Sequence, residues 1–292
     1  MSETLAARPA NIEISLSTLG RAGDFGALAH YADPAYYTLT YGKRRTDVDY
    51  YVRRARSVVG PVLEYGCGNG RISLPMVAAG ATVFGVDLSG PMLKDLEARL
   101  ARAPQGHRQR LRWLQGDMRT VELDERFDLI LAPFNTFLHL YDQKDVTQFL
   151  ARVRDHLNIG GTFLFDVSIP RASELARKPT RRYRAPRFRD PTTGQWIQYS
   201  ERFEYDPVRQ LRVIWMDFEP EDGSAPWTVP LTHRQFFPME LQSLLSCAGF
   251  DDLRITADFT DLAPDFEVDS LVFECHRGRP SRGPLDAATT EP

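Results

Sequence analysis

The stretch VLEYGCGNGRISLPMVAAGATVFGVDLS, residues 62–89, decides the fold of this chain. An apolar run leads into three glycines at alternate positions, Gly66, Gly68 and Gly70, and a second apolar run ends at the acid Asp87. Glycine lets a backbone reach positive φ and approach a ligand closely. The stretch therefore predicts a strand, a glycine-rich turn that faces a ligand, a helix and a second strand.

Five short apolar runs of strand type occur in the first 170 residues. They are VLEYG at 62–66, ATVFGVD at 81–87, LRWLQGD at 111–117, FDLILAP at 127–133 and GTFLFDV at 161–167. Segments of helical period lie between them, at 72–80, 91–103 and 147–158, and the last is followed by a predicted helix stop at 158–161. Alternating strands and helices imply parallel strands joined by helical crossovers. We expect an α/β fold with a doubly wound, Rossmann-like, mostly parallel sheet.

The pattern changes after the fifth strand. Residues 171–194 are basic and rich in proline, which is typical of a long loop or lid. Residues 195–220 alternate polar and apolar side chains around Asp206 and Pro207, which predicts an antiparallel hairpin. The apolar face of this insertion is expected to cover the substrate or to form a dimer contact.

The last part of the chain returns to the main sheet. Residues 232–250 have helical period, and 251–259 with 269–277 predict two antiparallel strands at one edge, which brings the sheet to seven strands. The expected divisions are a flexible N-terminus (1–30), an N-terminal helical lid (31–60), a Rossmann-like domain (61–170 and 231–276), a basic loop with an antiparallel insertion (171–230) and a disordered tail (277–292).

Composition excludes several classes of protein. The 292 residues carry a net charge of −3 and are 42% hydrophobic, so nothing global indicates nucleic acid or an anionic membrane as a partner. Cys67, Cys247 and Cys275 match no zinc spacing, and no metal site is predicted. The N-terminus lacks the features of a signal peptide, and no apolar run would span a bilayer. A cytoplasmic protein, monomeric or homodimeric, is the expectation.

The glycine spacing narrows what the turn can hold. Candidates are a dinucleotide, a phosphate and S-adenosylmethionine. The dinucleotide fingerprint G-x-G-x-x-G is absent, and so is the lysine of a phosphate loop. Asp87 follows the turn by about 20 residues, where an acid accepts hydrogen bonds from both hydroxyls of a ribose.

The motifs together resemble class I S-adenosylmethionine-dependent methyltransferases over roughly residues 40–275. The similarity rests on E-x-G-C-G-x-G at 64–70, GVDLS at 85–89, QGDM at 115–118, PFNTFLHL at 133–140 and NIGGTFLFDV at 158–167. Ile159 stands where that family usually has proline. The pattern is also similar to glycine and amino-sugar N-methyltransferases, which have a tyrosine-bearing N-terminal segment and an antiparallel insertion after strand five.

The resemblance implies S-adenosylmethionine as cofactor and Asp117 as the acid that bonds the adenine amino group. Glu64 is expected to bond loop amides or to lie near the methionine end. Tyr37 could fold over the sulfonium, and Arg45 could pair with the methionine carboxylate. The expected cofactor-binding residues are Glu64, Gly66, Cys67, Gly68, Gly70, Arg71, Asp87, Leu88, Gly116, Asp117, Met118, Pro133, Tyr37 and Arg45.

Methyl transfer from a sulfonium is an in-line displacement that depends on positioning and on exclusion of water. An amine acceptor must first lose its proton, and a hydroxyl acceptor needs a base or a metal ion. His139 is the candidate base, because imidazole titrates near neutrality. Asn135, four residues earlier, and Tyr41, near the sulfonium, complete the expected catalytic set. Packing roles for all three remain the alternative.

A small-molecule methyltransferase is the favoured interpretation, with N-methylation ahead of O-methylation. The run at 177–189 holds seven Lys or Arg and two aromatic residues, so RNA is an alternative substrate, and a protein is another. A solvated loop is the simpler interpretation of that run, and nucleic acid is not the expected partner. An NAD(P)-dependent oxidoreductase and a non-catalytic adenosylmethionine-binding protein are the remaining alternatives.

Overall fold

Strand β1 (Val62–Tyr65) lies inside the larger of two sheets, and all of its side chains are buried. The computed structural model describes residues 28–250 and 252–277. The other strands of this sheet are β2 (Val83–Asp87), β3 (Leu111–Gln115), β4 (Phe127–Ala132), β5 (Leu157–Ser168), β10 (Asp252–Ala257) and β11 (Ser270–His276).

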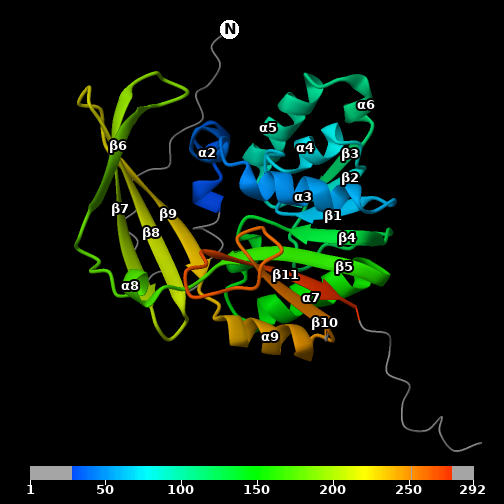
Figure 1. Ribbon diagram of the computed structural model, residues 1–292. Helices are drawn as coiled ribbons and strands as arrows, with labels where there is room; N and C mark the ends of the chain where they lie inside the picture. The colour runs from blue at the N-terminus through cyan, green and yellow to red at the C-terminus, as the bar shows by residue number, and fades with distance from the viewer. Residues whose placement is uncertain (1–27, 251, 278–292) are drawn as a thin grey trace, which may run out of the picture.

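The seven strands have the order β10-β11-β5-β4-β1-β2-β3, so the direction of winding reverses beside β1 (Figure 1). Strands β1 to β5 pair in parallel, and β11 pairs antiparallel with both β5 and β10. The predicted doubly wound, mostly parallel sheet with an antiparallel edge is therefore confirmed.

Helices cover both faces of this sheet, because successive strand residues point to opposite sides. One face is covered by α3 (Thr46–Arg56), α4 (Ser73–Ala78) and α5 (Gly90–Ala101), and the other by α7 (Gln143–His156) and α9 (Pro238–Cys247). Val62 belongs to the hydrophobic core on the α3 side and Leu63 to the core on the α7 side. The short helices are α2 (Pro34–Tyr41), α6 (Gln105–Arg108), the 3₁₀ turn η2 (Thr136–His139) and α8 (Ala172–Leu175).

The predicted helix stop at 158–161 was wrong. Helix α7 is capped by Asp142, whose side chain accepts a hydrogen bond from the backbone N–H of Asp145 at 2.8 Å, and it ends at His156. Strand β5 begins at the next residue. The segment 158–161 is an irregularity within the β4–β5 pairing, where Gly160 has φ +80°. Extra residues in one strand bulge outward and leave the pairing on either side intact.

A second, antiparallel sheet contains β6 (Tyr183–Arg189), β7 (Trp196–Asp206), β8 (Leu211–Pro220) and β9 (Trp227–Arg234), in that order (Figure 1). The hairpin predicted around Asp206 is confirmed, because this residue pairs with Leu211 at the end of β7 and β8. Strand β9 was not foreseen. It carries the second sheet to Arg234, past the expected boundary at 231.

The expectation of a loop over 171–194 was wrong in part, because this segment contains helix α8 and strand β6. Strand β6 is at the edge of its sheet, so it bonds to one neighbour alone. Its pairing with β7 is irregular between Ala185 and Phe188, which leaves room for Pro186. Proline is tolerated at such edge positions and bulges, and a proline-rich composition therefore hid a strand.

The N-terminal segment packs against both sheets. Tyr36 of α2 packs on Phe218 of β8 with ring centroids 5.0 Å apart. On the other side, the Ser89 hydroxyl donates to the Tyr31 carbonyl at 3.1 Å. The expected flexible N-terminus and disordered tail lie outside the described residues, except for 28–30 and 277. Within the described ranges, no helix has the length and apolar character needed to cross a membrane.

Candidate active site

A cavity lies at the carboxyl ends of β1, β2 and β4, beside the point where the strand order reverses, which is where open α/β sheets bind ligands. Most of the predicted cofactor-binding residues line it, namely Tyr37, Glu64, Gly66, Cys67, Gly68, Arg71, Asp87, Leu88, Gly116, Asp117, Met118 and Pro133. His139 lines it as well. Gly70, Arg45, Asn135 and Tyr41 do not line this cavity.

The glycine turn approaches its neighbours too closely for any larger residue. Gly66 has φ +70°, and a Cβ built on it would come within 2.5 Å of the Thr136 hydroxyl. Gly70 has φ +81°, and a Cβ there would meet Leu96 of α5 at 2.5 Å. Gly66 thus keeps the turn close to the loop after β4, whereas Gly70 lets the turn pack on a helix away from the cavity.

Asp87 ties the glycine turn to the second strand. One carboxylate oxygen accepts from the backbone N–H of Gly68 and the other from that of Ser89, both at 2.7 Å. Burial raises the pKa of Asp87, and these two amides act against that rise. Ser89 also caps α5 through its side chain. The carboxylate is therefore fixed at the cavity wall, in the position predicted for a ribose partner.

Glu64 is a buried acid beneath the turn, not a solvated strand residue. It accepts a hydrogen bond from the Ser73 hydroxyl. Burial raises the pKa of Glu64 to about 8, so its neutral form is the larger fraction at pH 7. A positively charged group nearby would favour the ionised form, and the methionine end of an adenosylmethionine carries such charge.

Asp117 forms an ion pair at the other end of the cavity. Its carboxylate accepts from the Arg119 guanidinium at 2.7 Å, and the same guanidinium reaches Asp145 at 3.0 Å. Burial alone would raise the pKa of Asp117, but the bonds from Arg119 outweigh it and lower the pKa. Arg119 was not predicted, although it follows the QGDM motif directly in the sequence.

His139 is held by two tyrosines. Its Nε2 shares a hydrogen bond with the Tyr31 hydroxyl at 3.0 Å, and its Nδ1 shares one with the Tyr141 hydroxyl at 3.2 Å. Tyr141 in turn bonds the Thr232 hydroxyl at 2.8 Å, on β9 of the second sheet. Burial lowers the pKa of His139 to about 4, so the ring is neutral at pH 7. Neither tyrosine was predicted, although Tyr141 lies two residues beyond His139.

A buried acid, Asp166, fixes the backbone conformation of the loop after β4. Asp166 of β5 accepts from the backbone N–H of Phe134 at 2.7 Å, from that of Asn135 at 3.2 Å and from the Tyr51 hydroxyl at 2.5 Å. Phe134 and Asn135 have φ of +55° and +63°, which is rare for residues other than glycine.

Asn135 consequently points away from the cavity. Its side-chain oxygen accepts from the backbone N–H of Ser168 at 2.7 Å and from the Ser168 hydroxyl at 3.1 Å. The expected shared helical face with His139 was wrong, because the turn is a 3₁₀ helix that starts at Thr136.

Arg71, and not Arg45, brings positive charge to the cavity. It bonds both oxygens of the buried Asp47, at 2.6 and 3.2 Å, and its guanidinium lies 4.2 Å from the centre of the Phe134 ring. Arg45 is exposed and pairs with Asp49 at 3.3 Å. Tyr41 packs on the Phe134 ring with centroids 5.1 Å apart, behind the lining residues.

Comparisons with known proteins show that this chain is similar to methyltransferases. A family model described as a methyltransferase domain matches residues 62–161. A putative methyltransferase of Bacillus subtilis, YqeM, is 28% identical over 227 residues, which are 75% of this chain and 85% of that protein. The solved CcbJ methyltransferase of Streptomyces caelestis is 25% identical, with a TM-score of 0.69, and the match covers 80% of this chain and 90% of that one.

The glycopeptide N-methyltransferase MtfA, solved with S-adenosyl-L-methionine, is 26% identical, with a TM-score of 0.55, over 80% of this chain and 94% of its own. This chain contains a methyltransferase domain and is an S-adenosylmethionine-dependent methyltransferase. The cofactor of the methyltransferase is S-adenosylmethionine. The cavity fits this molecule, because Asp87 presents carboxylate acceptors for a ribose and the backbone of Gly66 and Gly68 lines the cavity beside it.

We expect Gly66→Ala to weaken S-adenosylmethionine binding, because a methyl group at positive φ collides with Thr136 and shifts the turn. The dissociation constant should rise by roughly tenfold or more, as measured by calorimetry. Gly223→Ala is the matched control, since Gly223 has φ +82° but no atom within 4 Å of a built Cβ. Equal affinities in the two variants would contradict the role given to the close approach at Gly66.

We expect Asp87→Ala to weaken S-adenosylmethionine binding by about 100-fold or more, since hydrogen bonds to a charged group contribute about 1.5–3 kcal/mol each. Calorimetry measures the affinity, and thermal unfolding shows whether the fold persists. Glu125→Ala is the control, because Glu125 pairs with Arg112 in an exposed ion pair away from the cavity. Unchanged affinity in a folded Asp87→Ala protein would rule out the ribose assignment.

Proposed function

We propose that this methyltransferase transfers the methyl group of S-adenosylmethionine to a nitrogen atom of a small-molecule acceptor. The observation that carries the proposal is the state of His139, a neutral imidazole fixed by Tyr31 and Tyr141 at the edge of the cofactor cavity. We assign the roles of the site residues from their positions in the cavity. Asp87 binds the ribose, Asp117 lies at the adenine end, and Glu64 and Arg71 lie at the methionine end.

S-adenosylmethionine supplies an activated methyl group when it is bound. The chain's own residues position the two reactants and exclude water. Tyr31 and Tyr37 line the cavity from the N-terminal segment, where Tyr37 is buried and Tyr31 is half-buried. Both ring nitrogens of His139 are taken by Tyr31 and Tyr141, so the ring acts by fixing these two phenols at the cavity. A phenol oxygen can accept a hydrogen bond from the acceptor's N–H, which orients the acceptor's lone pair. In this scheme His139 is a positioning group.

The low pKa of His139 favours a nitrogen atom over an oxygen atom as the methyl acceptor. An alkylammonium has a pKa of about 10 and His139 one of about 4, so moving the proton onto the ring would cost about 8 kcal/mol. An amine avoids this cost by binding in its neutral form, with a free lone pair. A hydroxyl has no such option, because it reacts well only with a base or a metal ion.

The known relatives also support a nitrogen atom as the methyl acceptor. MtfA is a glycopeptide N-methyltransferase, and the match with this chain covers 94% of its length at 26% identity. The second sheet reaches the site through Thr232, which bonds Tyr141. We propose that this sheet covers the acceptor, as part of the division into a methyltransferase domain, an N-terminal lid and an insertion.

The basic run 177–189 does not favour RNA as substrate. Arg182 bonds Asp217 at 3.0 Å and Glu219 at 3.3 Å, and Arg187 bonds Glu221 at 3.0 Å. These arginines neutralise acids of their own sheet, so the run presents less free charge than its sequence suggests. Phosphate binding depends on positive charge that is available to the ligand.

We expect transfer to amines and little transfer to the matched alcohols. Paired acceptors, for example amino sugars and the corresponding sugars, are incubated with methyl-labelled S-adenosylmethionine. For the amines, kcat/KM should rise with pH toward the pKa of the amine, because only the neutral form attacks. His139 should add no inflection between pH 5 and 8, since it is already neutral there. Preferential labelling of the alcohols would refute N-methylation.

We expect His139→Ala to lower turnover by roughly 10- to 100-fold, because the two phenols that orient the acceptor lose the ring that fixes them. The affinity for S-adenosylmethionine should stay within about twofold, as measured by calorimetry. His107→Ala, at the distant helix α6, is the control. A turnover close to that of the unaltered enzyme would show that His139 serves only in packing.

A further inference from the structure

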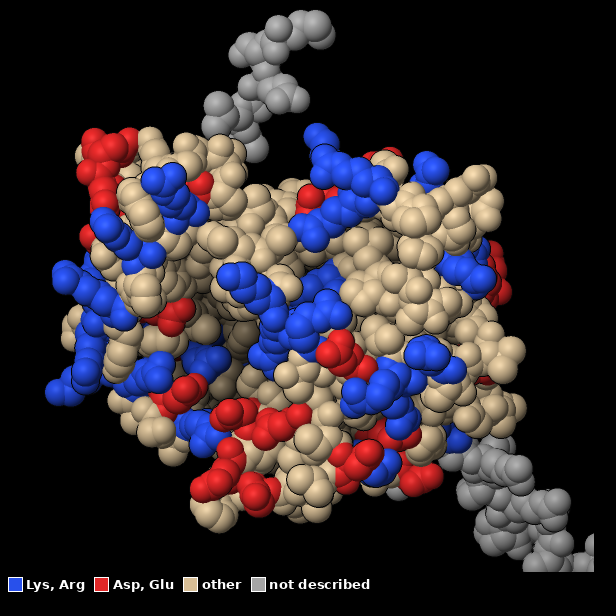
Figure 2. Space-filling model, turned by 45° about the horizontal axis from the view of Figure 1, so that its top comes forward, with Lys and Arg blue, Asp and Glu red and all other residues tan. Residues whose placement is uncertain are grey.

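A second hollow lies between the two sheets, beside the cofactor cavity. It has a volume of about 550 Å³ and is lined by residues from both sheets and from the segment before α3. Its charged and buried polar residues are Arg44, Arg171, Glu174, Arg212, Gln235, Asp258, Asp269 and Ser270. Figure 2 shows the molecule hollowed between the insertion and the main domain, with Lys and Arg side chains on both rims. We call this hollow the arginine cleft.

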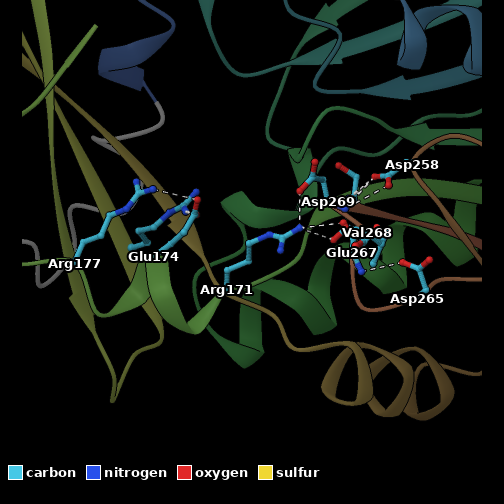
Figure 3. Close-up of polar contacts among 10 residues, drawn as sticks. Arg171, Glu174, Arg177, Asp258, Asp265, Glu267, Val268 and Asp269 are labelled. Carbon is cyan, nitrogen blue, oxygen red and sulfur yellow. Dashed lines mark hydrogen bonds and ion pairs between the residues drawn. The ribbon is translucent and has the colours of Figure 1, made fainter.

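The acids of the arginine cleft are already occupied. Glu174 accepts from Arg177 at 3.4 Å and from Arg212 at 2.8 Å. Asp258 accepts from the backbone N–H of Ser270 at 2.7 Å and from that of Asp269 at 3.2 Å. Figure 3 shows these carboxylates turned toward their partners within the protein. A ligand in the arginine cleft therefore meets few acceptors with unused capacity.

The arginines have donors to spare. Arg171 uses a single nitrogen, Nη2, to bond Asp269 at 2.6 Å and the carbonyls of Glu267 and Val268 (Figure 3). The Nε of Arg212 is buried without a hydrogen-bond partner among the described residues. The Arg212 side chain is 15% exposed and lines the arginine cleft, so a ligand's oxygen can approach the outer part of its guanidinium.

Arg44 is the arginine whose charge is least neutralised. Its Nε lies 3.5 Å from Asp47, but both oxygens of that acid already bond Arg71. Its guanidinium instead lies over two rings, 5.4 Å from the centre of Phe134 and 5.6 Å from that of Phe259. The side chain is 43% exposed, so it can meet a ligand without a change in the core.

One aromatic ring links the cofactor cavity to a residue of the arginine cleft. Phe134 lines the cofactor cavity, and Arg44, which lies over the same ring, lines the arginine cleft. A molecule bound at Arg44 would thus lie close to Phe134, which lines the cofactor cavity. The position suits the part of an acceptor that does not react.

We propose that the arginine cleft binds an acidic group of the methyl acceptor, a carboxylate or a phosphate, with Arg44 and Arg212 as its main partners. This inference rests on the proposed function, since it names the chemical class of the acceptor, an amine that also carries an acid. The planar guanidinium matches both oxyanions through paired N–H donors. The spare donors and the occupied acids both select for an anion and against a cation.

Binding of benzoate, phenyl phosphate and benzamide tests the inference. Each is titrated by calorimetry into the enzyme saturated with S-adenosylhomocysteine, which keeps the probes out of the cofactor cavity. Benzoate or phenyl phosphate should bind at least tenfold more tightly than benzamide, and the tighter of the two identifies the acid. Equal binding of all three would overturn the proposal.

Variants assign the binding to the arginine cleft. Arg44→Gln and Arg212→Gln should each weaken the favoured anion by roughly fivefold or more, with thermal unfolding as the check on folding. Arg187→Gln is the matched control, because Arg187 is 55% exposed on the edge strand β6 and does not line the cleft. If Arg187→Gln weakens binding as much as Arg44→Gln, or if Arg44→Gln has no effect, the proposal is wrong.

The two proposals fail in different ways. Selective anion binding that depends on Arg44, in an enzyme that methylates alcohols and not amines, would overturn N-methylation and leave the anion site standing. Methylation of amino acids and of their amides with equal kcat/KM would overturn the anion site and leave N-methylation standing.

Discussion

The buried carboxylate of Asp166 is the constraint on which the reaction site depends. It holds the backbone of Phe134 and Asn135 in a left-handed conformation that costs of order 1–3 kcal/mol per residue, and it does so with two N–H donors and the Tyr51 hydroxyl. Because the chain turns there, His139 reaches the cavity and Asn135 does not. The same acid joins α3, β5 and the loop after β4, so the lid side and the sheet share one anchor. Burial raises the pKa of Asp166 to about 6, as is expected for an acid with so little contact with water.

The part of the cavity that we expect to hold the cofactor could be predicted because its residues lie close together in the sequence. A glycine turn after one strand and an acid at the end of the next must meet at the same edge of a parallel sheet, and the cavity contains Gly66, Gly68 and Asp87 as expected. The parallel core of the sheet follows from the same alternation of strands and helices. These features need no knowledge of side-chain packing, which is why a single sequence suffices for them.

The part of the cavity that we propose to face the acceptor could not be predicted in the same way. Tyr31 and His139 are 108 residues apart, and Tyr141 and Thr232 are 91 apart, so no spacing rule connects them. Arg45 was predicted from its charge, yet helix α3 directs it outward and Arg71 takes the place at the cavity. Strand β6 was missed because basic residues and proline resemble a loop, although an edge strand accepts both.

Phe134 gives the molecule a property that neither hollow has alone. Its ring contacts one arginine from each, with the Arg71 guanidinium of the cofactor cavity 4.2 Å from its centre and the Arg44 guanidinium of the arginine cleft 5.4 Å from it. The two hollows are therefore connected through the contacts of one side chain. A smaller residue at this position would remove the ring that both guanidinium groups lie over. One substitution would thus change the electrostatic surroundings of both hollows together.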